Sequence, residues 1–253
     1  MLKTRVIPIV LLKDGEMAVK SVRFDWLRPI NHPINSARVY NARDVDELIF
    51  LDISATREQR RPLFDLIALA LDECFMPLTV GGGIKDMDDI HALLKIGADK
   101  VAINTQAALT PDIVTKGAKE FGSQCIVASI DVKETAKNKY EVFTHCGKTS
   151  TGLDPVEWAK EMEARGAGEI LVNSIDRDGT EEGYSIPLIR RIADAMNIPV
   201  IAAGGAGSLD DFVKAVKEGH ASAVAASSIF LFTDTTPNNV KEYMKKHGIN
   251  TRI

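Results

Sequence analysis

Cysteine is scarce in this sequence: three occur in 253 residues, at positions 74, 125 and 146. Cysteines at these spacings form neither a paired disulfide framework nor a metal-binding pattern, so we expect a reducing, cytoplasmic environment. The five histidines also lack the spacing of metal ligands. These absences lead us to expect neither a metal nor another cofactor.

The sequence also lacks a strong excess of one charge and any long hydrophobic run. Its formal net charge is −4, which argues against a general nucleic-acid binder or a protein that binds anionic membranes. The apolar run near the N-terminus, residues 5–12, is too short to cross a bilayer and has no small-residue cleavage site after it. We therefore expect no nucleic-acid partner and no membrane partner, and we interpret this run as a buried strand.

What the sequence does contain is an internal repeat. Each copy has an apolar strand, a glycine turn, an amphipathic helix, a second glycine turn and another strand. Five matched pairs lie 122 positions apart: Pro77 and Pro199, Gly82 and Gly204, Gly83 and Gly205, Asp89 and Asp211, and Gly97 and Gly219. A repeat with a period of half the chain predicts one domain, residues 1–253, built from two similar halves at about 1–122 and 123–253.

Eight apolar runs alternate with eight helical patterns along the chain. Strands that are apolar on both faces and alternate with helices are typical of a parallel sheet, and eight such pairs close into a barrel. We therefore predict an α/β fold, a (βα)8 TIM barrel with a two-fold half-barrel repeat. The expected strands are 5–12, 48–53, 78–80, 100–103, 125–130, 169–173, 200–203 and 222–225, and the expected helices are 34–43, 58–73, 86–95, 111–121, 154–165, 186–196, 209–217 and 237–247. Two long loops, 13–33 and 133–152, occupy matching places in the halves.

Both glycine clusters of the repeat fall at the carboxyl ends of predicted strands, where the chemistry of such barrels is located. Glycines let backbone N–H groups approach an anion, and the following helix N-terminus adds a positive dipole. Asn104 and Thr105 in one half, and Ala226 and Ser227 in the other, could supply further amides and hydroxyls. A matched pair of such sites predicts a ligand with a phosphate at each end. The alternative is that the glycines only form tight turns.

Nine segments together carry a specific resemblance. They are residues 13–15 (KDG), 50–53 (FLDI), 80–84 (VGGGI), 99–105 (DKVAINT), 121–124 (FGSQ), 130–131 (ID), 166–170 (GAGEI), 174–180 (SIDRDGT) and 204–207 (GGAG). With them the chain resembles the cyclase subunit of imidazole glycerol phosphate synthase over nearly its whole length. In that family the barrel takes ammonia from a glutaminase and uses it to cleave and cyclise a linear bisphosphate nucleotide. The resemblance implies that a phosphorylated small molecule binds at the C-terminal face, with contacts from Gly83, Asn104, Thr105, Asp178, Gly179, Gly205, Ala226 and Ser227.

One catalytic residue that the resemblance implies is missing. The family has an aspartate at the ends of strands 1 and 5, a pair suited to general acid and base catalysis. The second is present as Asp131, our candidate catalytic residue. Alignment of Lys13 with Lys133 puts Leu11 where the first belongs, and Asp14 has the opposite strand parity. Whether the chain is an enzyme, a lyase in a glutamine amidotransferase complex, therefore stays open.

Other positions at the barrel mouth also depart from the family pattern. Asn173 stands where the family has threonine, and Ala203 and Cys146 stand where it has serine. The sister isomerase of histidine biosynthesis, which this fold also resembles, relies on an aspartate at both strand ends. The missing aspartate therefore counts against that activity too.

At the opposite end of the barrel, the resemblance implies an ammonia gate. Arg5, Glu47, Lys100 and Glu169 stand at the starts of strands 1, 2, 4 and 6, where the family has a ring of four charges around the ammonia passage. Four such charges can neutralise one another, as buried charges must. The alternative is that each is an ordinary solvated charge. With this ring, the resemblance implies a glutaminase subunit docked on the N-terminal face.

Three hypotheses for the function follow. In the first, the chain is a paralogue of the cyclase subunit that passes ammonia to a sugar amidotransferase, which converts an acetamido sugar to an acetamidino sugar in surface polysaccharide biosynthesis. In the second, it is an authentic imidazole glycerol phosphate synthase cyclase. In the third, it is a non-catalytic subunit that only activates its glutaminase. The chain keeps the ring of charges but lacks the strand-1 aspartate, and this combination favours the first hypothesis.

Overall fold

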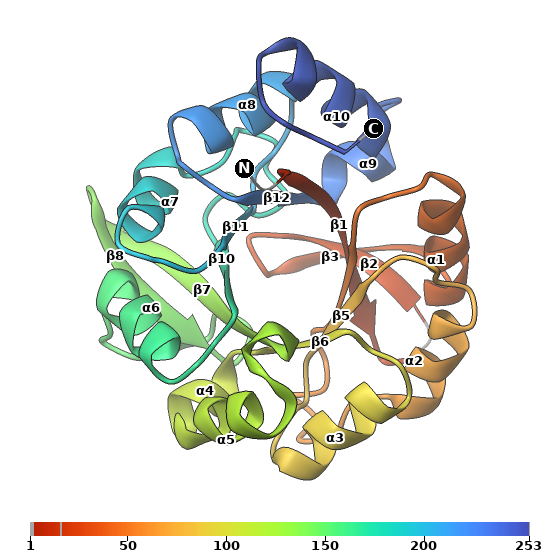
Figure 1. Ribbon diagram of the computed structural model, residues 1–253, viewed down its shortest axis with the longest axis vertical. Coiled ribbons are helices and arrows are strands. Elements are labelled where there is room, and N and C mark those ends of the chain that lie inside the picture. Colours follow the sequence, from red (N-terminus) through yellow and green to blue (C-terminus); the bar gives the residue numbers. More distant parts are fainter. Residues whose placement is uncertain (1–2, 16, 253) are drawn as a thin grey trace.

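The computed structural model describes residues 3–15 and 17–252, and it confirms the predicted (βα)8 TIM barrel. The barrel strands are β1 (Arg5–Lys13), β4 (Leu48–Asp52), β5 (Leu78–Gly81), β6 (Lys100–Ile103), β7 (Ile126–Ala136), β10 (Glu169–Ser174), β11 (Val200–Ala203) and β12 (Ala223–Ala226). They pair in parallel in the order β1-β4-β5-β6-β7-β10-β11-β12, and β12 closes the barrel on β1. Figure 1 looks into this ring, with the helices outside it.

The helices cover the outside of the barrel. Eight of them follow barrel strands and match predicted segments: α1 (Pro33–Ala42), α2 (Phe64–Leu71), α3 (Met87–Lys95), α5 (Asp112–Phe121), α6 (Pro155–Ala164), α7 (Ile186–Ala193), α8 (Leu209–Lys217) and α10 (Pro237–Lys246). The prediction for α2 is wrong at its start, because Gln59 has a left-handed φ of 54° and Pro62 follows. No helix in residues 3–15 and 17–252 is long and apolar enough to span a bilayer.

Local sequence fixes where several of these helices begin. The Asp154 carboxylate accepts hydrogen bonds from the backbone N–H groups of Val156 and Glu157, and Pro155 occupies the first helical position of α6. Asp86 caps α3 in the same way through the N–H of Asp89. Such caps satisfy amides that the helix itself leaves without partners.

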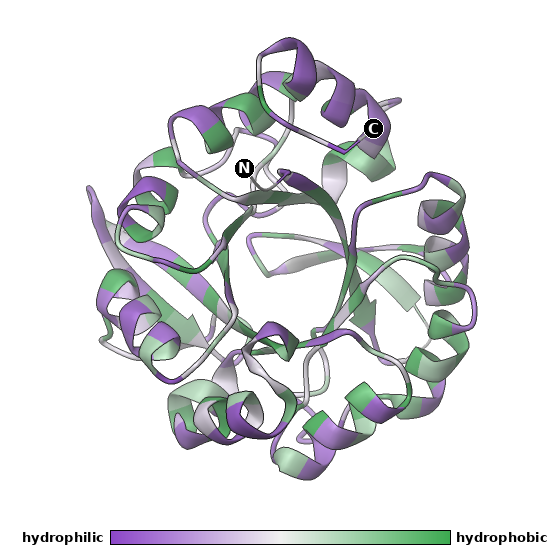
Figure 2. Ribbon diagram, in the orientation of Figure 1, coloured by the Kyte–Doolittle hydropathy of each residue, from purple (hydrophilic) through white to green (hydrophobic). Residues whose placement is uncertain are grey.

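Alternation along the strands divides the core into two layers. Val6, Val10 and Leu12 of β1 pack under the helices, whereas Ile7 and Ile9 point into the barrel. The buried side chains that share the interior are Ile7, Ile9, Leu11, Val19, Ile49, Ala102, Val127, Leu171, Ile201, Ala203, Ala223 and Ala225. Both layers are apolar, and Figure 2 shows this as green strands inside a ring of helices with hydrophilic outer faces.

The two long loops contain β-hairpins, which the sequence analysis did not predict. The first forms β2 (Met17–Val22) and β3 (Trp26–Asn31), and β2 pairs antiparallel with the end of β1. The second forms β8 (Lys139–Thr144) and β9 (Thr149–Ser150), and β8 pairs antiparallel with an extended β7. Two short helices, α4 (Thr105–Leu109) and α9 (Ser228–Phe232), were also not predicted. Each of these features occurs once in each half, so the repeat extends to them.

A buried ion pair joins the last helix, α10, to the segment before β4. Lys241 Nζ on α10 lies 3.2 Å from Asp46 Oδ1 and 3.1 Å from the carbonyl oxygen of Asp44. Both charged side chains are 4% exposed. The other oxygen of Asp46 accepts a hydrogen bond from the N–H of Val6 on β1, at 3.0 Å. The pair therefore ties the end of the chain to its beginning.

We expect Lys241→Met to lower the free energy of unfolding by about 3–5 kcal/mol, because it leaves the Asp46 carboxylate buried without a cation. Urea unfolding at neutral pH measures this. Lys245→Met, an exposed position on the same helix, should change stability by less than about 0.5 kcal/mol. An equal effect of the two substitutions would mean that the ion pair has no special part in closing the barrel.

Candidate functional site

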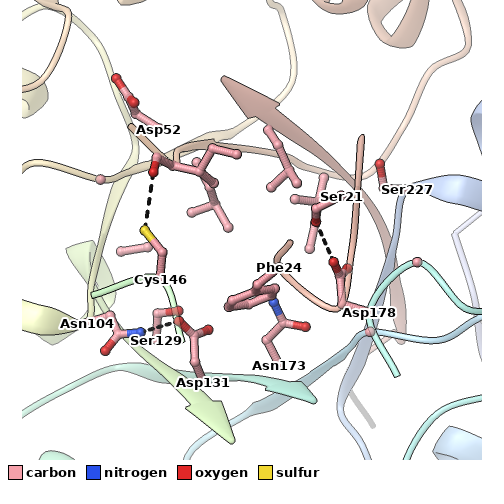
Figure 3. Close-up of a pocket in the computed structure, with 18 of the residues that line it drawn as sticks. Ser21, Phe24, Asp52, Asn104, Ser129, Asp131, Cys146, Asn173, Asp178 and Ser227 are labelled. Atoms are coloured by element: carbon pink, nitrogen blue, oxygen red, sulfur yellow. Dashed lines mark hydrogen bonds between the residues drawn. The ribbon is translucent and has the colours of Figure 1, made fainter. Parts of the chain in front are cut away.

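The carboxyl ends of the barrel strands surround a cavity of about 200 Å³. Figure 3 shows its lining side chains, which come from the strand ends, from the βα loops and from the two hairpins. All nine residues predicted for the mouth line it: Gly83, Asn104, Thr105, Asp131, Asp178, Gly179, Gly205, Ala226 and Ser227. The barrel thus brings the two halves of the predicted site together.

Asp131 lies deep in this cavity. Its Oδ2 accepts a hydrogen bond of 2.6 Å from the Nδ2 of Asn104 on the neighbouring strand end. Burial, followed by the negative charge of Asp178, raises the pKa of Asp131 to about 7, while the Asn104 hydrogen bond acts in the opposite direction. A carboxyl that titrates near neutral pH can both give and take a proton. Asp131 is therefore suited to acid–base chemistry.

Leu11 stands across the barrel from Asp131, because β1 and β7 are separated by three strands on either side. Its side chain is 8% exposed and packs with Ile9 and Leu51 at the floor of the cavity. The prediction that its side chain points inward is thus confirmed. One wall of the mouth is apolar where the family pattern has a carboxylate.

Neither nearby aspartate takes the place of that carboxylate. The Asp14 carboxylate accepts a hydrogen bond from Ser54 and does not line the cavity, as its strand parity predicted. Asp25 does line the cavity, but it is an exposed residue that pairs with Lys148 at 2.8 Å. Neither aspartate therefore supplies a carboxylate on the inward face of β1, opposite Asp131.

Asp178 serves a role that the sequence did not reveal. Its two carboxylate oxygens accept hydrogen bonds from Lys20 Nζ at 3.0 Å and from Ser21 Oγ at 2.5 Å. Lys20 is only 3% exposed, and both donors come from β2 of the first hairpin. The Asp178 carboxylate therefore holds the first hairpin over the mouth by these two hydrogen bonds. The predicted phosphate contact of Asp178 stays a prediction, and Lys20 is an additional cation beside it.

The tips of the two hairpins meet above the cavity. Asp25 of the first pairs with Lys148 of the second, and Phe24 is among the side chains that line the cavity (Figure 3). The turn residues Phe24 and Cys146 both have left-handed φ, of 62° and 57°. Non-glycine residues adopt this conformation only where their surroundings enforce it, and such positions gather at functional sites.

Cys146 donates a hydrogen bond from its Sγ to the carbonyl oxygen of Ile53 at 3.2 Å. Burial, with a further contribution from Asp131, raises the pKa of the Cys146 thiol to about 11. A thiol with such a pKa is almost entirely protonated at neutral pH. It is therefore poorly suited to act as a nucleophile.

Packing alone accounts for the glycines of the two predicted phosphate loops. A Cβ on Gly82 would lie 2.2 Å from the carbonyl oxygen of Asp52, and one on Gly205 would lie 2.3 Å from that of Gly183. Ser227 provides a separate sign of a ligand, because its buried Oγ has no hydrogen-bond partner among the described residues. The second half thus offers a hydroxyl for an entering oxyanion.

At the N-terminal end of the barrel, the four predicted gate residues do form a closed ring. Arg5 lies 2.6 Å from Glu47 and 2.8 Å from Glu169, and Lys100 lies 3.0 Å from each of these carboxylates. Glu47 is 2% exposed and also accepts a hydrogen bond from Thr79 at 2.7 Å. Burial alone would lower the pKa of Arg5, but Glu47 and Glu169 raise it above its ordinary value. The alternative of four separate solvated charges is thus wrong.

Sequence reasoning did not identify Lys20, Ser21 and Arg57 as residues of the mouth. Lys20 meets Asp178 across 158 positions, and no local pattern signals such a pairing. Among residues 3–15 and 17–252, no group of three or more histidine, cysteine, aspartate or glutamate side chains could hold a metal ion.

Comparison with known proteins places these features in a family context. A family model described as "Histidine biosynthesis protein" matches residues 5–236. The match therefore includes all barrel strands, the mouth residues and the ring of charges.

We expect Asp131→Asn to remove a pH dependence of stability. The carboxyl of Asp131 has an ordinary pKa of 3.8 and a folded-state pKa of about 7. Between these values the folded state keeps a proton that the unfolded chain loses, so the wild-type free energy of unfolding falls as the pH rises. The decrease is at most about 1.4 kcal/mol per pH unit, and it is complete above the folded-state pKa.

Urea unfolding of the wild type and of Asp131→Asn, between pH 3.8 and about pH 7, measures the difference in their free energies of unfolding. Over this pH range the variant should become more stable relative to the wild type as the pH rises. Curves that stay parallel would contradict the raised pKa.

Proposed function

We propose that this chain, which belongs to the histidine biosynthesis protein family, receives ammonia from a glutaminase on the N-terminal face of its barrel and conducts it to the mouth. The acceptor in this proposal is an acetamido sugar, amidated by a sugar amidotransferase in surface polysaccharide biosynthesis. The observation that carries the proposal is a combination of two features. A closed ring of charges lies at the N-terminal end of the barrel, and the mouth at the other end lacks the strand-1 carboxylate. The ring consists of Arg5, Glu47, Lys100 and Glu169.

The interior above the ring favours passage of neutral ammonia. The next inward side chains are apolar and many are small, including Ala102, Ala223 and Ala225. A neutral molecule can pass such a section, whereas an ammonium ion would lose its hydration without compensation. Because the ring is closed in the free chain, we expect its ion pairs to part when the partner docks and delivers ammonia.

The N-terminal face also has a feature suited to a partner. Phe75 lies in the connection between α2 and β5, at the end of the barrel where the ring is located. Its side chain is 88% exposed, which leaves an aromatic ring almost wholly in water. Aromatic residues are enriched in protein interfaces, and in this proposal Phe75 contacts the glutaminase.

The mouth favours a conduit over the cyclisation reaction. Acid–base assistance is worth roughly 10²–10⁴-fold in rate, and with Leu11 in place of an aspartate one of its two groups is absent. The two glycine loops would then bind an anion, and Asp131 would support part of a reaction.

The authentic cyclase remains the second candidate because one observation favours it. Asp131, with its pKa of about 7, and the paired glycine loops all line one cavity. A third candidate, a subunit that only activates the glutaminase, shares the docking face but needs no passage through the barrel.

The conduit proposal predicts that label from amide-¹⁵N glutamine reaches the sugar product only when the barrel is present with the glutaminase and the amidotransferase. In Lys100→Met, two ion pairs of the ring are lost, so more of the label should escape to bulk water per glutamine hydrolysed. Mass spectrometry of the product and of free ammonia measures both. Lys95→Met, on the outer helix α3, is the control. Transfer that is unchanged when the barrel is omitted would refute the conduit.

The cyclase alternative predicts a different result in cells. If the conduit proposal holds, the wild-type chain should fail to restore growth of a cyclase-deficient histidine auxotroph. Leu11→Asp restores the second carboxylate, and we expect it to raise cyclase activity by roughly 10²-fold or more. Cyclase turnover measured in vitro with ammonium salts tests this directly. Growth of the auxotroph at the wild-type rate with the unaltered chain would favour the second candidate over the first.

A further inference from the structure

The loop between β4 and α2 carries a cation that lines the mouth without an acidic partner. Arg57 is exposed and lines the cavity, and it forms no ion pair with any residue that the structure describes. The other two arginines of the loop are paired. Arg60 lies 2.6 Å from Asp52, and Arg61 lies 2.7 Å from Asp86. Arg57 is therefore available to bind an anion from solution.

The two-fold repeat shows what is missing beside Arg57. The register of β10 on β11 repeats that of β4 on β5 at the 122-residue spacing of the repeat. Thr56 is therefore equivalent to Asp178, whose carboxylate pairs with Lys20 at 3.0 Å. Arg57, next in the chain, is equivalent to Gly179. The second half thus contains both charges of an ion pair at this place, whereas the first half contains a cation beside a neutral hydroxyl.

The second hairpin brings another positive charge to the same part of the mouth. Burial, followed by the negative charge of Asp131, raises the pKa of the Cys146 thiol to about 11. Arg57 and Lys148 both act in the opposite direction, so both cations lie near this thiol, and both line the cavity. Lys148 pairs with Asp25, but these side chains are 54% and 80% exposed, and such a pair is weak in water. Lys148 can therefore exchange this partner for an anion of the ligand.

The loop that carries Arg57 packs against the first glycine turn. A Cβ on Gly83 would lie 2.7 Å from the Cβ of Ala55 and 3.0 Å from the carbonyl oxygen of Arg60. Arg57 lies between these two residues in the chain. Thr56, beside it, also lines the cavity. An anion at the Gly83 turn would thus have a second, positively charged position next to it.

We propose that Arg57 and Lys148 form a subsite for a second phosphate group, so that the end of the ligand at the Gly83 turn is a diphosphate. The planar guanidinium can donate two parallel N–H hydrogen bonds to one phosphate, and the two phosphates of a diphosphate are adjacent. The predicted phosphate contacts include neither cation, and conduction of ammonia requires neither. The proposed function has an anion at the glycine loops, and the subsite rests on that part of it alone.

Calorimetric titration of the full chain with inorganic pyrophosphate and with inorganic phosphate, in buffer free of divalent cations, tests the subsite. Arg57→Met should weaken pyrophosphate binding by about tenfold or more, the loss of a charged hydrogen bond. Phosphate, which can occupy the Gly83 turn alone, should change by less than about threefold. Unchanged pyrophosphate binding, or an equal loss for both anions, would overturn the subsite.

Two further variants separate charge from geometry. Arg190→Met removes the same charge from an exposed position on α7 outside the cavity, and it should bind pyrophosphate as the wild type does. Arg57→Lys keeps the charge but not the fork of donors, so its loss should be only about threefold. Both positions are exposed, so we expect all three variants to fold. A loss in Arg190→Met equal to that in Arg57→Met would reduce the effect to net charge and overturn the subsite.

These titrations need neither a glutaminase nor an amidotransferase. Their failure is therefore distinguishable from a failure of the labelled-glutamine transfer, which tests the conduit.

Discussion

The alternation of side chains along the strands of a closed barrel is the constraint on which the rest of this structure depends. Closure leaves each inward side chain facing only others from the interior, so one column of β1 runs from Arg5 through Ile7 and Ile9 to Leu11. The same rule applies to the other strands. It stacks a charged ring, an apolar section and a polar mouth on one axis. A route for ammonia along that axis is our proposal for what this stacking does.

The two halves of the barrel differ at a pair of equivalent positions that matters for the site, Leu11 and Asp131. Hairpins, glycine turns and short helices recur in both halves, yet Leu11 and Asp131 differ at equivalent positions. The polar groups of the deep mouth therefore gather on β6, β7 and β10, opposite an apolar wall. Asp131 is the carboxyl on this polar side, and burial, followed by the negative charge of Asp178, raises its pKa. A symmetric pair of carboxylates would create a different site in the same fold.

Patterns within the sequence predicted most barrel strands to within one or two residues, since β-branched apolar runs bounded by glycine turns are local signals. β7 is the exception, because it continues to Ala136 into the second hairpin. Residues 133–136 at the end of β7 are all exposed and give no alternation, whereas β8 does alternate, with Tyr140, Val142 and Thr144 buried. The predicted start of α2 was wrong because the charged residues that follow Asp52 have the composition of a helix. In the structure, the chain turns back there and Arg60 forms an ion pair with Asp52.

By itself, the sequence determined the barrel, its two-fold repeat, the inward position of Leu11 and the four charges at the strand starts. These follow from local periodicity, or from a resemblance carried by contiguous motifs. Only the tertiary structure decided that the four charges form a closed ring, that Lys20 pairs with Asp178, and that Asp131 forms no ion pair with any residue that the structure describes. Such pairings join residues far apart in the chain. Their energy depends on distance and burial, which no local pattern encodes.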